Sequence, residues 1–386
     1  MIYLDNAATT PVDPEVKAIM LPYLSEEFGN PTSKYYSLAT RASEAVEDAR
    51  SKVATLINAD PKEIIFTSCA TESNNMVIKG VADYKKYVEG KGNHLITSTV
   101  EHKSVLQPFR FLAGFENATQ NVEKNRFRPG KKAVRIIDRG YHATFLPINE
   151  YGQVEPDTLR NAITDQTILV SLIWGNNEIG SLNDIYSLGS ICRENGILFH
   201  SDATQVLGKI EINVRDMPVD FLSFSAHKIY GPKGIGAIYM RMDEYGIRPE
   251  ITAFMHGGAQ EDGYRAGTLA VHNIVGFGKA AEIAKRDMKT YIPKISEMER
   301  QLKAILQENF PNATFNGHPE KKIPGLVSVN IPGINNELLV KQLAEAGMAC
   351  STGSACAIEA DSTNVLRFAI NKFTHSTELL SVRHLF

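Results

Sequence analysis

The chain has 386 residues, of which 43% are hydrophobic and 22% charged, and its formal net charge is −3. This length and composition predict a globular protein with two domains, or with one large domain and a smaller one. A net charge so close to zero gives no overall reason to expect a membrane partner or direct binding of nucleic acid. We see no apolar run long enough to cross a bilayer and no signal peptide, which together predict a cytoplasmic protein.

Short apolar runs alternate with helical patterns through the first 230 residues. One example is the stretch 39–57, where apolar residues recur at helical spacing. We expect buried strands at residues 64–67, 94–97, 168–173, 197–200 and 221–224. This alternation predicts an α/β fold with a mostly parallel sheet flanked by helices, in which the chemistry lies at the carboxyl ends of the strands.

The pattern changes at about residue 280. A long amphipathic helix over about 280–309 is followed by strand candidates at 327–331 and 366–370. We therefore expect a smaller α+β domain in the C-terminal part. The predicted division is a large domain over residues 15–285 and a small domain formed by residues 1–14 and 286–386.

One segment, residues 116–139, is unusually basic, with seven Lys or Arg against three acidic residues. A solvated surface loop is the favoured interpretation. The alternative is a docking patch for an acidic partner or nucleic acid.

Lys228 follows the predicted strand 221–224, together with Ser225 and His227. A lysine at a strand end can form a Schiff base with an aldehyde cofactor if its amine is partly deprotonated. The neighbouring serine and histidine could then bind phosphate oxygens. Taken alone, the same pattern also fits an ordinary solvated lysine.

Three further groups follow predicted strands. Asp202 could pair with a protonated pyridine nitrogen, or it could cap a helix. The small residues of 67–75 open a helical pattern and could bind an anion on free backbone N–H groups, or they could form a simple Ser/Thr cap. The imidazole of His102 could stack on a flat cofactor ring, although a lone histidine is more often structural.

These residues belong to a series of nine motifs that occur in order. The motifs are Asp5–Pro11, Phe28–Pro31, Ala70–Asn75, Glu101–Lys103, Asn176–Gly180, Asp202–Gln205, His227–Gly234, Arg265–Thr268 and Ser351–Cys356. With them the chain resembles the cysteine desulfurases, which are fold-type I pyridoxal-phosphate (PLP) enzymes of aminotransferase class V. The resemblance runs from about Tyr3 to Leu380.

The resemblance implies an activity. L-cysteine would be converted to L-alanine, with a persulfide formed on Cys356 and passed to an acceptor or scaffold protein. Iron–sulfur cluster assembly, tRNA thiolation and DNA thiolation are all possible destinations, and the sequence does not choose among them. Two alternatives stay open: selenocysteine lyase or another class V PLP enzyme, and an inactive adaptor of a sulfur system.

The resemblance also implies residue roles. Lys228 would hold the cofactor and later move protons, Asp202 would pair with the pyridine nitrogen, and His102 would stack on the ring. Gln205 would contact the ring hydroxyl. The phosphate would be held by Ala70, Thr71, Ser225 and His227, and in the neighbouring subunit by Thr268, which implies a homodimer.

For the substrate, the resemblance implies binding by Asn177, Asn30 and Arg367. Arginine suits a carboxylate because it can pair with it through two parallel hydrogen bonds. Arg367 stands only 11 positions after Cys356, which indicates a large deletion after the nucleophile relative to the family. A rival alignment would give the carboxylate-binding role to Arg383. The segment 116–139 looks like an insertion, and the C-terminus stops early.

Four cysteines are present, and their spacing matches no zinc pattern, so no metal site and no disulfide framework are expected. Cys356 lies in a turn-rich stretch of small residues, which suits an accessible thiolate rather than a buried, inert thiol. Cys350 is the nearest rival, but its apolar neighbours predict burial. Cys192 lies in a helical pattern and is expected to be buried.

Overall fold

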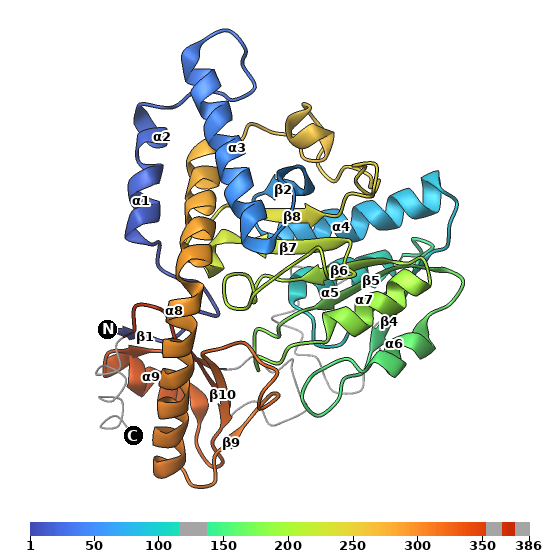
Figure 1. The fold of residues 1–386 in the computed structure, drawn as a ribbon. Coiled ribbons are helices and arrows are strands. Elements are labelled where there is room, and N and C mark those ends of the chain that lie inside the picture. Colours follow the sequence, from blue (N-terminus) through green and yellow to red (C-terminus); the bar gives the residue numbers. More distant parts are fainter. Residues whose placement is uncertain (116–136, 353–364, 375–386) are drawn as a thin grey trace.

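The computed structural model describes residues 1–115, 137–352 and 365–374. Cys356, Arg383 and most of the basic segment 116–139 lie outside these ranges. Among the described residues, no helix combines the length and the apolar character that a membrane span requires. Figure 1 shows a large sheet with helices on both faces and a smaller sheet beside the lower half of one long helix.

Seven strands form the large sheet, in the order β2-β8-β7-β6-β5-β3-β4. In chain order they are β2 (Ile64–Thr67), β3 (His94–Ser98), β4 (His142–Leu146), β5 (Thr167–Ile173), β6 (Leu198–Asp202), β7 (Phe221–Ser225) and β8 (Gly236–Met240). All pairs are parallel except the two that β8 makes. The predicted α/β fold with a mostly parallel sheet is therefore confirmed.

Each strand named from the sequence is present, with ends that differ by at most two residues. The largest change concerns β6, which runs on to Asp202, so this carboxylate ends the strand instead of following it. Two strands of the large sheet, β4 and β8, were not predicted. The residues of β4 are mostly half-exposed, so this edge strand lacks the continuous apolar run that marks the central ones.

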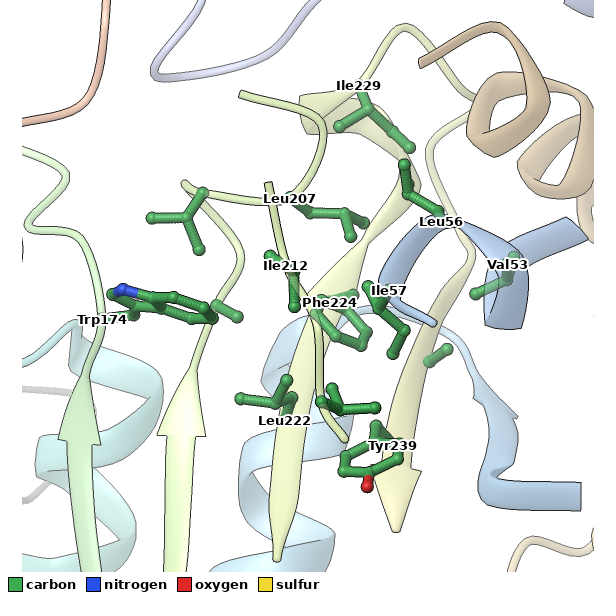
Figure 2. Close-up of a cluster of buried hydrophobic side chains, with 14 of the residues drawn as sticks. Val53, Leu56, Ile57, Trp174, Leu207, Ile212, Leu222, Phe224, Ile229 and Tyr239 are labelled. Atoms are coloured by element: carbon green, nitrogen blue, oxygen red, sulfur yellow. The ribbon is translucent and has the colours of Figure 1, made fainter. Parts of the chain in front are cut away.

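The sheet is buried on both faces because its central strands are nearly continuous apolar runs whose successive side chains point to opposite faces. In β7, Leu222 and Phe224 face one hydrophobic cluster and Phe221 faces the other. Figure 2 shows the first cluster, where Leu222 and Phe224 meet Ile57 and Tyr239.

The helices around the sheet are α1 (Pro14–Met20), α2 (Pro22–Ser25), α3 (Ser37–Ile57), α4 (Ala70–Asp83), α5 (Lys103–Leu112), α6 (Pro156–Ala162), α7 (Ile185–Glu194) and α8 (Val271–Asn309). Of these, α1 and α2 pack mainly on α8 and not on the sheet itself. The helix expected over 280–309 begins nine residues earlier, since Val271, Ile274 and Phe277 pack into the large core. At Gly278 a Cβ atom would lie 2.5 Å from the Cα of Ala49, so glycine permits the close approach of α3 and α8.

The C-terminal part forms a second, smaller core on the other half of α8. Its elements are β9 (Thr314–Phe315), β10 (Leu326–Asn330), α9 (Asn336–Glu345), β11 (Met348–Ala349), β12 (Ser351–Thr352) and β13 (Val365–Ala369). The sheet order is β12-β13-β10-β9, and β1 (Ile2–Tyr3) pairs with β11. The boundary expected at residues 285/286 would fall inside α8, which contributes to both cores, and the division into domains stays a prediction.

Candidate active site

A cavity of about 370 Å³ lies at the carboxyl edge of the large sheet. Ten of the thirteen residues that the sequence suggested for a site line it: Ala70, Thr71, His102, Asn177, Asp202, Gln205, Ser225, His227, Lys228 and Arg367. They meet because parallel strands end at a common edge and because β13 of the small sheet brings Arg367 to the same place. Their roles remain predictions.

Three predicted residues are not in this set. Asn30 and Thr268 are exposed and do not line the cavity of this chain. The Asn30 side chain caps its own turn, where its Oδ1 accepts from the backbone N–H of Thr32 at 3.1 Å. Cys356 lies outside the described residues.

The amine of Lys228 is held at the cavity by the N-terminal segment. Its Nζ donates to the carbonyl oxygen of Ala8 at 2.7 Å and also to that of Ala7. Burial, reinforced by the positive charge of Arg367, lowers the pKa of Lys228 to about 8. An appreciable fraction of this lysine is therefore neutral near physiological pH, which is the form that attacks an aldehyde.

Asp202 is a buried carboxylate at the end of β6. Its Oδ2 accepts from Asn74 at 2.8 Å and its Oδ1 from the backbone N–H of Thr204 at 3.0 Å. No α-helix begins here, and Oδ1 of Asp202 caps the turn that follows the strand instead. No cation lies within ion-pairing distance of this carboxylate in the described part of the chain.

A hydrogen-bonded chain joins Asp202 to His102. Asn74 donates both to Asp202 and to the Ser104 hydroxyl at 2.8 Å, and this hydroxyl lies 2.7 Å from Nδ1 of His102. The backbone N–H of Ser104 also donates to Nδ1, so the proton of the neutral ring is on Nε2. We did not predict Asn74 and Ser104 from the sequence, although both lie within or next to quoted motifs.

The phosphate-binding candidates gather at the start of α4. The first turn of this 14-residue helix leaves backbone N–H groups without intrahelical partners at Ala70 and Thr71. The hydroxyl of Ser225 is buried and has no hydrogen-bond partner among the described residues. Burial and the charge of Lys228 lower the pKa of His227 to about 4, so this ring is neutral and carries one N–H donor.

Gln205 and Arg367 complete the lining. Gln205 donates to the Ala7 carbonyl at 2.8 Å and accepts from Nζ of Lys209 at 3.1 Å, which fixes the orientation of its amide. Arg367 pairs with Glu178 at 2.9 Å and with Asp5 at 3.3 Å. Neither acidic residue was predicted as part of the site.

These residues fit pyridoxal phosphate. The unpartnered hydroxyl of Ser225 and the free N–H groups of α4 suit a phosphate group. The Asp202 carboxylate, buried without a cation, suits a protonated pyridine nitrogen. Lys228 has the lowered pKa that Schiff-base lysines need. The arrangement therefore defines the class as fold-type I PLP enzymes.

Comparison with known proteins agrees with this class. The family model for class-V aminotransferases matches residues 2–126 and 132–381, with a break inside the basic segment. The chain is 42% identical over 393 residues to a protein named mitosomal cysteine desulfurase from Encephalitozoon cuniculi, covering 98% of this chain and 84% of that protein. It is 44% identical over 356 residues to cysteine desulfurase IscS of Neisseria meningitidis serogroup C, covering 92% and 80%.

The solved structure of a NifS-like protein has the same fold. It superposes with a TM-score of 0.86 at 31% identity, over 99% of this chain and 97% of that one. The chain belongs to the cysteine desulfurases of the class-V aminotransferase family, which are PLP-dependent enzymes.

Proposed function

We propose that this protein is a cysteine desulfurase that takes the sulfur of L-cysteine onto Cys356, releases L-alanine and passes the sulfur to an acceptor protein. The observation that carries the proposal is the gathering of Lys228, Asp202 and Arg367 around one cavity from three separate parts of the chain. A Schiff-base lysine, an anion for a pyridine ring and a cation for a carboxylate are together what an amino acid substrate of a PLP enzyme requires.

Each of these side chains has a defined task in the proposal. Arg367 holds the substrate carboxylate, with the help of Asn177. Bound pyridoxal phosphate supplies the electron sink for the charge that develops at the substrate α-carbon. Lys228 takes the proton from this carbon with its Nζ, which its lowered pKa permits near neutral pH.

Sulfur transfer then needs a thiolate. The thiolate of Cys356 attacks the sulfur of the substrate, so that an S–S bond forms and the Cβ–S bond breaks. The bonding electrons stay on the substrate carbon, which takes up protons to become alanine, and the enzyme keeps a persulfide. Cys356 itself lies outside the described residues.

The three cysteines among the described residues are weaker candidates for the attacking thiolate than Cys356. Burial raises the pKa of Cys192, and burial with the charge of Asp5 raises the pKa of Cys350 to about 12. Cys350 is half-buried against the smaller core, so the burial expected from its neighbours is partial. Cys69 lines the cavity and is the thiol that a test must separate from Cys356.

The test compares Cys356→Ala with Cys69→Ala in the holoenzyme. We expect Cys356→Ala to abolish the release of sulfide and alanine from cysteine, whereas Cys69→Ala keeps most of it. Unchanged turnover in Cys356→Ala would favour selenocysteine lyase or another class V enzyme in which this thiol is dispensable. A purified protein without a cofactor absorbance band that depends on Lys228 would favour the inactive adaptor.

Three finer parts belong to the same proposal. The protein is a homodimer in which the exposed Thr268 reaches the phosphate of the neighbouring subunit, it resides in the cytoplasm, and it delivers sulfur to a protein acceptor. Light scattering would test the dimer and cell fractionation the location. Activity measured with and without candidate acceptors would test the delivery.

A further inference from the structure

Arg367, the proposed carboxylate ligand, already has two carboxylates beside it. Its Nη1 donates to Glu178 Oε2 at 2.9 Å and to the carbonyl oxygen of Asn177 at 3.2 Å. Its Nη2 donates to Asp5 Oδ1 at 3.3 Å. Its Nε is buried and has no hydrogen-bond partner among the described residues.

The two carboxylates are placed differently. Glu178 lines the cavity and stands next to Asn177 in the chain. Asp5 does not line the cavity and comes from the N-terminal segment, 362 residues away from Arg367. Its Oδ1 also accepts from the hydroxyl of Ser351 at 3.0 Å, so one oxygen serves two donors.

The N-terminal segment holds Asp5 firmly in this place. The backbone N–H of Leu4 donates to Ala349 at 2.8 Å, and that of Asn6 donates to Ala369 at 3.3 Å. The hydroxyl of Tyr3 donates to the Asp5 carbonyl at 3.1 Å. The backbone on both sides of Asp5 is thus held, by β11 on one side and by β13 of the small sheet on the other.

A substrate carboxylate would share Nη2 of Arg367 with Asp5. Nη1 already donates to two acceptors and Asp5 takes one of the two hydrogens of Nη2, so a carboxylate that binds Arg367 through two hydrogen bonds uses Nε and the second hydrogen of Nη2. It then lies beside Asp5 in a largely buried place, since the side chains of Arg367 and Asp5 are only 10% and 21% exposed. Like charges at such a place repel each other more strongly than in water.

We propose that Asp5, which takes one hydrogen of Nη2 of Arg367 in the substrate-free enzyme, competes with the substrate carboxylate for the charge of Arg367 and so limits the affinity of the cavity for amino acids. The inference rests on the proposed function, because it takes Arg367 as the carboxylate ligand. It adds a residue that sets substrate affinity without lining the cavity, although its charge also acts on Lys228.

The test measures binding separately from turnover. L-Alanine carries the same carboxylate and amine as L-cysteine but no sulfur, so its equilibrium binding to the holoenzyme can be followed through the absorbance of the bound cofactor. Asp5→Asn keeps the shape of the side chain and removes the charge. We expect it to bind L-alanine roughly fivefold more tightly, because the carboxylate of L-alanine then no longer lies beside a second negative charge.

Two control variants separate the explanations. Asp5→Glu keeps the charge and should bind L-alanine no more tightly than wild type. Glu15→Gln changes the net charge equally but lies on the surface, paired with Arg286, and should leave binding unchanged. With L-cysteine, Asp5→Asn should lower KM by a similar factor and change kcat less than twofold.

The outcomes are distinguishable. Weaker or unchanged binding of L-alanine by Asp5→Asn, or equal effects of Asp5→Asn and Asp5→Glu, would overturn the inference. Arg367→Gln should lose most of the L-alanine binding. If it binds as wild type does, the role of Arg367 in the proposed function fails and the inference fails with it. A thermal melt of each apoprotein checks that the variants fold.

Discussion

Replacing Ser225 by alanine should weaken cofactor binding without weakening the fold. Ser225 ends β7 and is 2% exposed, yet its hydroxyl has no hydrogen-bond partner among the described residues. A buried hydroxyl without a partner destabilises the cofactor-free protein. The same hydroxyl is ready to donate to a phosphate oxygen. The variant therefore removes a destabilising, unpartnered hydroxyl from the apoprotein, and it removes a hydrogen bond to the phosphate from the holoenzyme.

The sizes of the two effects follow from hydrogen-bond energetics. A hydrogen bond to a charged group contributes about 1.5–3 kcal/mol, which corresponds to a dissociation constant for pyridoxal phosphate raised by roughly 10- to 150-fold. An unpartnered buried polar group costs about 1–3 kcal/mol, so the Ser225→Ala apoprotein should be as stable as wild type or more stable.

A neighbouring serine provides the matched control. Ser201 in β6 is also fully buried, but its hydroxyl donates to the Leu172 carbonyl at 2.7 Å and does not line the cavity. Ser201→Ala should lower the stability of the apoprotein by about 1 kcal/mol and leave cofactor affinity unchanged. Urea unfolding of the apoproteins and equilibrium dialysis with pyridoxal phosphate measure both quantities. A Ser225→Ala variant that loses stability but keeps its cofactor affinity would refute the reasoning.

Two further predictions concern pH. Because only the neutral amine attacks an aldehyde and the pKa of Lys228 is lowered to about 8, the rate at which apoprotein captures pyridoxal phosphate should rise with pH and level off above pH 8. A rate that keeps rising to pH 10, as for an ordinary lysine, would contradict this. Burial, and next the charge of Asp202, raise the pKa of Glu101 to about 8, whereas the unfolded chain ionises near about 4.3. The stability that protonated Glu101 contributes should be lost as pH rises through this window, so Glu101→Gln should melt progressively higher than wild type from pH 5 to 8, and parallel melting curves would argue against a neutral Glu101.

The order of strands and helices could be predicted because apolar periodicity is a local property. The alternation over β2, β5 and β7 appears directly in the sequence, and the predicted strands match the observed ones within two residues. The start of α8 was missed, since its first turns are buried on more than one side and lack a clear polar face. The edge strand β4 was missed because its residues are only partly buried.

The candidate site was predictable where a residue type and a strand end coincide. Lys228, Asp202 and Ser225 all stand at the ends of parallel strands, and this position alone is enough to bring them to one edge of the sheet. The part that could not be predicted depends on which side chains face each other. Asn74 and Ser104 join Asp202 to His102 only because α4 and α5 pack together above the sheet.

The sequence by itself therefore determined the fold class and the family, and it predicted the lysine that would hold the cofactor, since these follow from local patterns and from motifs in a fixed order. The tertiary structure decided that Arg367 reaches the cavity and that Asp5 and Glu178 stand beside it. Contacts between segments more than 180 residues apart depend on strand register and on the packing of two cores against one helix. No periodicity along the chain encodes these distances, which is why the competition for Arg367 became visible only in three dimensions.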